Sequence, residues 1–238
     1  MANLDLTAGL PAGPDPEVAL LSAAGRAGLA RVWEVRAQAE LRAAGAFARL
    51  TAELVQRTRV REVQVLAGRA VADEIRHAEI CRKMAELYGE RDVPWPELKA
   101  EPLPQFGEAP PAFNLTLNVV LCTCVSETVA AELLRRCHAG AKGRAARWAL
   151  RELLKDEIEH ARLGWAHVAA IDAAERLELA VALPTLIGLA RQAWTAPSAV
   201  PAGLPLGHGW VDDEEVLRIF DEVLADVVRP GFAHLGVR

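Results

Sequence analysis

One five-residue pattern occurs twice in the chain, as Asp73-Glu74-Ile75-Arg76-His77 and as Asp156-Glu157-Ile158-Glu159-His160. Each copy lies in a long stretch with the apolar periodicity of a helix. Glutamate and histidine three residues apart lie on one helix face, about one turn apart, so a carboxylate oxygen and an imidazole nitrogen can reach the same ion. One such pair is a weak signal, because helix surfaces are rich in glutamate. Two pairs, each preceded by aspartate, predict a shared site between two helices.

Composition indicates an all-α protein. The 238 residues are 52% hydrophobic and 25% charged, enough for one large core or a core with an added subdomain. Glycine and proline gather in a few segments, and helix formers dominate the long stretches between them. The net charge is -5, with arginine interspersed among glutamate, so we expect no nucleic-acid partner.

The N-terminal residues and the cysteines favour a cytoplasmic protein. Residues 1–16 have neither the positive region nor the apolar segment of a signal peptide. We expect no stretch long and apolar enough to span a bilayer, and hence no membrane partner. The four cysteines form no Cys-x-x-Cys pair, which argues against a zinc ribbon, a rubredoxin-type iron site or a thioredoxin motif.

Proline and glycine divide the chain into helices. We predict a short helix from Asp15 to Gly25 or Gly28, long helices over about 29–58, 60–88, 114–138 and 144–173, and two further helices over about 175–194 and 213–228, the last ended by Pro230-Gly231. Six prolines between residues 89 and 112 predict an extended crossover. Short loop, long crossover, short loop is typical of ferritin-like bundles.

These elements suggest three parts: an N-terminal segment and short helix over 1–28, a four-helix bundle over 29–173, and a C-terminal helical extension over 174–238 packed on the bundle. The extension has three alternative roles. It could cap a pocket, form a subunit interface or complete the core.

A di-metal carboxylate bundle also needs one glutamate from each of its other two helices. Ligands on adjacent antiparallel helices must lie equally far from their shared loop. Glu74 lies roughly 21 Å into its helix, and Glu40 lies about as far before the preceding turn; Glu127 matches Glu157 in the same way. Both lie on apolar stripes, where an unpaired carboxylate is costly. Three other glutamates are interpreted as solvated surface charges: Glu34, Glu53 and Glu132.

With these ligands, residues 29–173 resemble the ferritin-like di-iron carboxylate superfamily, which includes ribonucleotide reductase small subunits, bacterial multicomponent monooxygenases, arylamine N-oxygenases, rubrerythrins and ferritins. The resemblance implies two metal ions, normally iron, although manganese could replace one. It implies that Glu74 and Glu157 bridge the ions and that Glu40 and Glu127 are terminal ligands. The implied ligand set is Glu40, Glu74, His77, Glu127, Glu157 and His160.

The aspartates sharpen the comparison. Asp-Glu-x-Arg-His is the form found in bacterial monooxygenases, where the aspartate of one helix holds the ligand histidine of the other. We therefore expect Asp73 to accept the N–H of His160 and Asp156 that of His77, which would fix both rings. The alternative interpretation is that each aspartate is only an exposed charge beside a ligand.

Small or apolar residues surround the predicted site and leave room for a substrate: Ala43, Ala44, Cys81, Cys124 and Gly164. Cys81 takes the place of the tyrosine of radical-forming reductases, although a free cysteine is more often a small buried hydrophobe. The only tyrosine, Tyr88, is roughly 16 Å further along the helix. Leu153 stands where arylamine N-oxygenases carry an extra histidine.

The leading functional hypothesis is an O2-activating, non-haem di-iron oxygenase or oxidase acting on a small organic molecule. No ferredoxin, flavin or rubredoxin motif is present, so a separate reductase or peroxide must supply the oxidising or reducing equivalents. A ferroxidase, iron-storage or peroxide-scavenging protein shares every ligand, and a metal-free helical scaffold is a third hypothesis. The sequence leaves the substrate and the oligomer open, with a homodimer among the alternatives.

Overall fold

The computed structural model describes residues 5–98, 102–196 and 199–238. Within these ranges every regular element is helical and none is a strand, which confirms the all-α prediction. The elements are α1 (Pro16–Ala19), α2 (Ala23–Arg57), α3 (Arg61–Gly89), α4 (Pro111–Val119), η1 (Val120–Glu127), α5 (Thr128–Ala139), α6 (Arg144–Ala170), α7 (Ala173–Trp194), α8 (Asp213–Val223), η2 (Leu224–Val228) and α9 (Arg229–His234).

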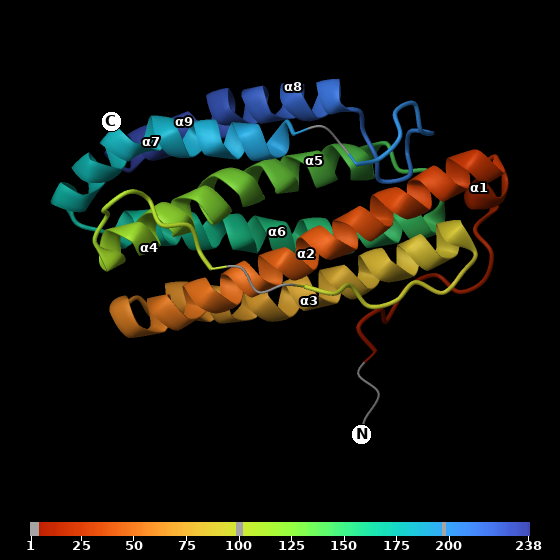
Figure 1. Cartoon of the computed structure of the whole chain (residues 1–238), viewed down its shortest axis with the longest axis horizontal. Coiled ribbons are helices and arrows are strands. Elements are labelled where there is room, and N and C mark those ends of the chain that lie inside the picture. Colours follow the sequence, from red (N-terminus) through yellow and green to blue (C-terminus); the bar gives the residue numbers. More distant parts are fainter. Residues whose placement is uncertain (1–4, 99–101, 197–198) are drawn as a thin grey trace.

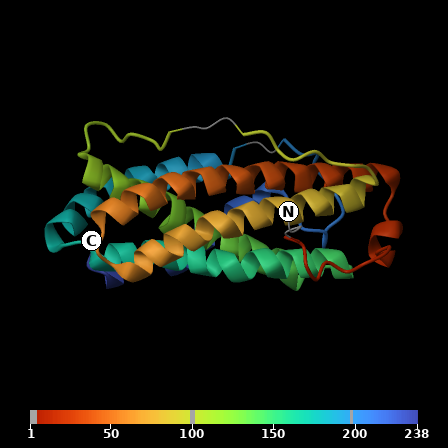
Figure 2. The same cartoon turned by 90° about the horizontal axis from the view of Figure 1, so that it is seen from below.

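Four long helical segments lie side by side and enclose the centre of the molecule (Figure 1). α2 packs along α3, α3 along α6, and α6 along the continuous helix formed by α4, η1 and α5. The links from α2 to α3 and from α5 to α6 are short, whereas the link from α3 to α4 is long. The described parts of this long link lie along the outside of α2 (Figure 2), where Leu98 approaches Gly45.

The N-terminal prediction was wrong at the start of the first long helix. α1 is a single turn, and α2 begins at Ala23, where the Ser22 hydroxyl accepts a hydrogen bond of 3.1 Å from the backbone N–H of Gly25. Gly28 lies inside α2, at a position where a Cβ would overlap the side chain of Leu204. These glycines therefore permit close packing rather than ending a helix, and a boundary at residue 28 would cut through α2.

The third long helix begins at Pro111, three residues before its predicted start at residue 114. Asn114 instead ties the end of the crossover to the helix, because its side chain accepts from the N–H of Phe106 at 2.9 Å and donates to the carbonyl of Pro104 at 3.1 Å. The middle of this helix, η1, has the wider π-type turn. Such π segments are rare and are frequent at functional sites.

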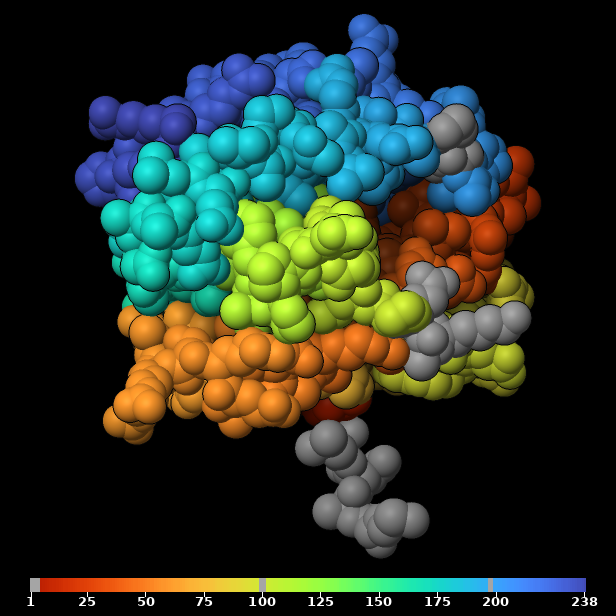
Figure 3. Space-filling model, turned by 60° about the vertical axis from the view of Figure 1, so that its left-hand side comes forward, coloured from red at the N-terminus to blue at the C-terminus, as the bar shows by residue number. Residues whose placement is uncertain are grey.

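The C-terminal elements share a core with the middle of the third long helix. Phe220 and Val228 are fully buried in one cluster with Val120 and Val125. Figure 3 shows the start of α4, in yellow-green, lying between α7, in cyan, and the end of α2, in orange. The C-terminal elements therefore pack against the third long helix.

The last helix does not stop at Pro230-Gly231, which corrects the prediction. α8 continues through η2 into α9, which ends at His234. Pro230 lies directly after the π-type turn η2, in the first turn of α9. Gly231 is required by packing, because a Cβ there would lie 2.9 Å from the ring of Trp165.

One helical stretch, Pro111–Ala139, is long and apolar enough to cross a membrane by length and composition alone. The expectation that no such stretch exists was therefore wrong. Half of its most apolar window is buried inside the protein, as in the core helix of a soluble protein, so the stretch is weak evidence for a membrane span.

Candidate metal centre

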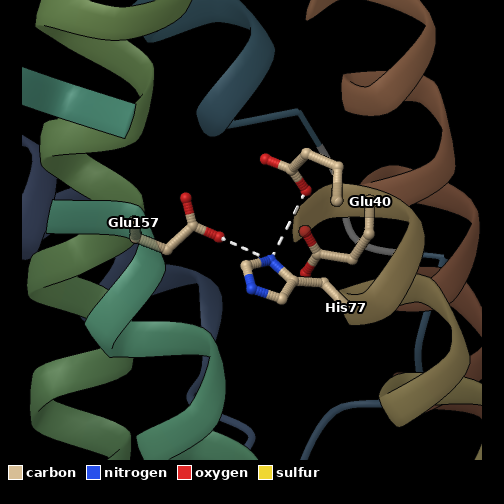
Figure 4. A group of neighbouring side chains, drawn as sticks. Glu40, His77 and Glu157 are labelled. Atoms are coloured by element: carbon tan, nitrogen blue, oxygen red, sulfur yellow. Dashed lines mark ion pairs between the residues drawn. The ribbon is translucent and has the colours of Figure 1, made fainter. Parts of the chain in front are cut away.

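Six side chains from the four long segments converge in the interior. They form two overlapping groups whose ligand atoms lie within 4.8 Å of one another: Glu40, Glu74, His77 and Glu157, and Glu74, Glu127, Glu157 and His160. Figure 4 shows Glu40, His77 and Glu157 of the first group pointing towards one another from different helices. The sequence pattern and the height argument selected these same six residues.

Glu74 and Glu157, which belong to both groups, each lie close to both histidines. Glu74 places Oε2 3.6 Å from Nδ1 of His77 and Oε1 3.1 Å from Nδ1 of His160. Glu157 places Oε1 3.5 Å from Nδ1 of His77 and Oε2 3.1 Å from Nδ1 of His160. Each carboxylate thus directs one oxygen to each histidine, a geometry suited to bridging two ions.

Glu40 and Glu127 each belong to one group only, on either side of the shared glutamates. Glu127 is the last residue of η1, so the π-type turn sets where its side chain enters the interior. The glutamates interpreted as surface charges lie outside both groups and pair with arginines on the helix surface: Glu34 with Arg31 and Arg91, Glu53 with Arg57, and Glu132 with Arg135 and Arg136.

The histidines turn their other nitrogen towards the aspartates, but unequally. Nε2 of His77 lies 3.2 Å from Oδ2 of Asp156, whose side chain is only 2% exposed. Nε2 of His160 lies 3.5 Å from Oδ2 of Asp73, which is 16% exposed, and makes no hydrogen bond within the described ranges. Arg69 lies 3.2 Å from both aspartates and so links them.

Arg76, from the first copy of the pattern, completes the surroundings of Asp156. Its Nη2 donates to Asp156 at 2.6 Å and to the carbonyl of Glu152 at 3.3 Å. Although burial raises the pKa of Asp156, the hydrogen bonds from His77 and Arg76 lower it to about 2. Asp156 is therefore held as an anion between a histidine and an arginine.

Crowding of the carboxylates shifts their pKa values. Burial raises the pKa of Glu40 and Glu127 well above the usual value, and the charges of Glu74 and Glu157 add to the effect. Burial raises the pKa of Glu157 as well, but its close contacts with the two histidines outweigh this and lower the pKa. Burial lowers the pKa values of His77 and His160, but the surrounding carboxylates raise them by more, so both lie above the usual value. Four interior carboxylates thus share two cationic partners.

The residues present fit a metal centre. Oε2 of Glu74 and Nδ1 of His77 are buried without a hydrogen-bond partner among the described residues. An orphaned buried acceptor or donor is costly, and a metal ion would satisfy both atoms. Carboxylate oxygens with imidazole nitrogens form a donor set suited to first-row metals such as iron and manganese.

A cavity of about 450 Å³ opens beside the centre. Glu40, Glu74, Glu127 and Glu157 line it, whereas neither ligand histidine does. Its far wall comes from the C-terminal extension, including Trp194, Trp210 and Val211. Of the three roles considered for the extension, the structure thus shows two, since it completes the core around η1 and forms a wall of this cavity.

Only one of the five residues expected around a substrate, Ala43, lines this cavity. Ala44, Cys81 and Cys124 are buried elsewhere in the core, and burial raises the pKa of both thiols. Gly164 was misassigned, since a Cβ there would overlap the hydroxyl of Thr123 and lie 2.6 Å from Sγ of Cys124. It is a point of contact between α6 and η1, not free space.

The sequence interpretation missed Arg36, which lines the cavity one turn before Glu40. Its spacing on α2 was a signal that could have identified it. The contribution of residues 209–211 had no comparable signal, because the residues of a proline- and glycine-rich linker show no periodicity that predicts their contacts.

Two histidines outside the centre are packed into the core. The Tyr88 hydroxyl lies 2.9 Å from Nδ1 of His208, and the carbonyl of His208 accepts from the indole N–H of Trp33 at 3.1 Å. Nε2 of His167 lies 2.9 Å from the Thr116 hydroxyl, which donates to Glu175 at 2.5 Å. His208 thus joins the C-terminal linker to α2 and α3, whereas His167 joins α6 to α4, and Thr116 extends that contact to α7.

Comparison with known proteins adds no relative: no protein-family model, curated protein or solved structure matches this chain.

Proposed function

We propose that the protein is a di-metal carboxylate oxidoreductase that activates O2 to oxidise a small organic molecule. The observation that carries this proposal is the pair of overlapping groups in which Glu74 and Glu157 each reach both histidines. Two equivalent half-sites joined by shared carboxylates suit two ions rather than one.

The proposal includes the ferritin-like four-helix bundle as the architecture of the four long segments, from the start of α2 at Ala23 to the end of α6 at Ala170. Its support is the short, long, short order of the links and the contribution of ligands from each of the four long segments. The interior position of all six ligands also argues against a metal-free scaffold, since buried charges seldom persist without partners.

In this proposal Glu74 and Glu157 would hold both ions, and Glu40 and Glu127 would each complete the ligand set of one ion. Two bound iron ions would supply the redox chemistry that activates O2. The residues of the chain supply orientation: Asp156 fixes the ring of His77 through a 3.2 Å contact, and Arg76 keeps Asp156 ionised and in place.

The cavity favours an organic substrate over a hydrated ion. It borders the four carboxylates on the side away from the histidines, and its remaining wall is mainly apolar, with Leu134, Trp194 and Trp210. An apolar wall excludes water and offers little to ferrous iron. A ferroxidase or storage function is therefore the second candidate, since it would use the same ligands without needing this wall.

Electron supply, location and assembly complete the proposal. A separate reductase, or peroxide, would provide the equivalents, because the chain carries no second redox motif. The four cysteines are all free thiols, which suits a reducing cytoplasm. A homodimer remains one arrangement compatible with this function.

The test is metal analysis of iron-loaded protein, followed by optical spectra as O2 is added to the anaerobically reduced form. We expect two irons per chain, and their loss in Glu74→Ala and Glu157→Ala. Glu132→Ala is the matched control, because this glutamate pairs with surface arginines. One tightly held zinc, or equal losses in all three variants, would refute the centre. A ferric mineral of many irons per chain would instead establish iron storage.

A further inference from the structure

The cavity beside the candidate centre has a single basic side chain among the described residues that line it, Arg36 of α2. The other charged lining residues are carboxylates, namely Asp213 and the four glutamates of the centre. Most of the remaining wall is apolar. Arg36 is therefore the one group of the cavity that can attract an anion by its charge.

Arg36 is held in place by the linker that precedes α8. Its guanidinium carbon lies 4.9 Å from the centroid of the Trp33 ring, and Nη2 donates to the carbonyl of Gly209 at 2.9 Å. Gly209 has φ 87°, and a Cβ there would lie 2.5 Å from Trp33, so the linker can approach the ring this closely only as glycine. The guanidinium is thus positioned before any ligand arrives.

This side chain lacks a counter-ion in the part of the chain that the structure describes. No carboxylate oxygen there lies within 4.0 Å of the guanidinium nitrogens of Arg36, and its Nη1 is buried without a hydrogen-bond partner. A guanidinium carries five N–H donors, and the carbonyl of Gly209 accepts from one nitrogen only. A buried donor without an acceptor is costly, so an acceptor from outside the chain would stabilise Nη1.

We propose that Arg36 binds the carboxylate of an organic monoacid whose apolar chain or ring occupies the cavity. This inference rests on the proposed function and names its substrate class. The forked guanidinium matches a carboxylate with two parallel hydrogen bonds. Arg36 precedes Glu40 by four residues, about 6 Å along the helix axis. An anchored acid therefore directs its carbon atoms along the Glu40 side of the centre.

The surrounding charges favour a monoanion over a phosphate. A phosphate dianion would find one cation, and it would meet the carboxylate of Asp213 and those of the centre in the same cavity. One carboxylate balances one guanidinium and leaves the rest of the ligand free to be apolar. The volume of about 450 Å³ lies in the range of small-ligand pockets.

The experiment measures binding of octanoate, octanamide and octyl phosphate to the full-length, iron-loaded protein by titration calorimetry. We expect octanoate to bind at least about 10-fold more tightly than octanamide, as charge-assisted hydrogen bonds require. Arg36→Gln should weaken octanoate binding about 10- to 100-fold and leave octanamide unchanged, while Arg36→Lys should retain part of the preference. Arg42→Gln, an exposed arginine of the same helix, is the matched control and should bind as the wild type does.

Equal affinities for the acid and the amide in the wild type would overturn the inference without the need for any variant. So would tighter binding of octyl phosphate, or octanoate binding that survives Arg36→Gln and disappears when the metals are removed, which would place the acid on the ions. Metal analysis of each protein separates the two proposals. If the chain binds no metal, the proposed function fails, yet the preference for octanoate over octanamide in the metal-free protein still decides the role of Arg36.

Discussion

Asp156→Asn tests whether a buried aspartate orients the metal-binding face of His77. The substitution preserves size and shape but removes a charge. Asp156 is 2% exposed and contacts Nε2 of His77 at 3.2 Å, Nη2 of Arg76 at 2.6 Å and Nη2 of Arg69 at 3.2 Å. All three contacts are charge-assisted while Asp156 is ionised.

Hydrogen bonds to charged groups contribute about 1.5–3 kcal/mol, against about 1 kcal/mol for neutral ones. The contact with His77 alone should therefore weaken by roughly 0.5–2 kcal/mol, and the poorer hold on Arg76 adds to this. We expect metal affinity to fall about 10- to 100-fold, equivalent to about 1.4–2.8 kcal/mol. Asp73→Asn should cost less than about 10-fold, because Asp73 is more exposed and lies 3.5 Å from His160.

The assay is anaerobic competition for Fe(II) or Co(II) against a chromophoric chelator, with circular dichroism to verify that the helices remain. Glu159→Gln is the matched control, since Glu159 lies on the same helix and, among the described residues, forms an ion pair only with Arg162, at 3.6 Å. Affinity within twofold of the wild type in Asp156→Asn would refute the orienting role. An equal loss in Glu159→Gln would show that any charge change on this helix has the same effect.

Three other substitutions test the packing, the cavity and a buried histidine. Gly164→Ala should destabilise the protein by about 1–3 kcal/mol in urea unfolding, because its Cβ would overlap η1, whereas Gly68→Ala, with no atom within 4 Å, should stabilise it by about 0.5–1 kcal/mol; equal midpoints would contradict the contact. Ala43→Phe should fill the cavity, keep both irons and abolish octanoate binding, and unchanged calorimetry would show that the cavity is not the binding site. Burial lowers the pKa of His167 to about 4, so its neutral form contributes stability that is complete above an unfolded pKa of about 6.5 and is lost, by about 3 kcal/mol, as the pH falls to 4. His167→Gln should therefore lose less unfolding free energy than the wild type between pH 7 and pH 4, and identical slopes would refute this assignment.

The repeated motif identified four of the six side chains that converge at the centre, and the height of Glu40 and Glu127 along their helices identified the other two. The reason is geometric and local. Glutamate and histidine three residues apart share a helix face wherever the helix lies, and the rise per residue converts sequence distance into height. Glu40 and Glu127 could be selected over Glu53 and Glu132 because the height of a residue on each of two antiparallel helices can be measured from the loop that joins them.

Element boundaries that depend on partners were predicted less well. Glycine is typical of helix ends, yet Gly28 and Gly231 both lie within helices, where the side chains of Leu204 and Trp165 approach them closely. A glycine that ends a helix and a glycine that admits a neighbour look the same in sequence, because the difference is made by the atom that packs against it.

The cavity, too, was decided by the tertiary structure. Helical spacing placed Gly164 and Cys124 near the centre, but α6 and η1 approach too closely there to leave space. The open side of the centre instead faces a wall from the C-terminal linker, which carries no periodic signal, and this linker also holds Arg36 in its position. Periodicity along one helix therefore determined which side chains point inward, while the separation between helices, set by the packing of residues distant in sequence, determined which of them meet a cavity and which meet another helix.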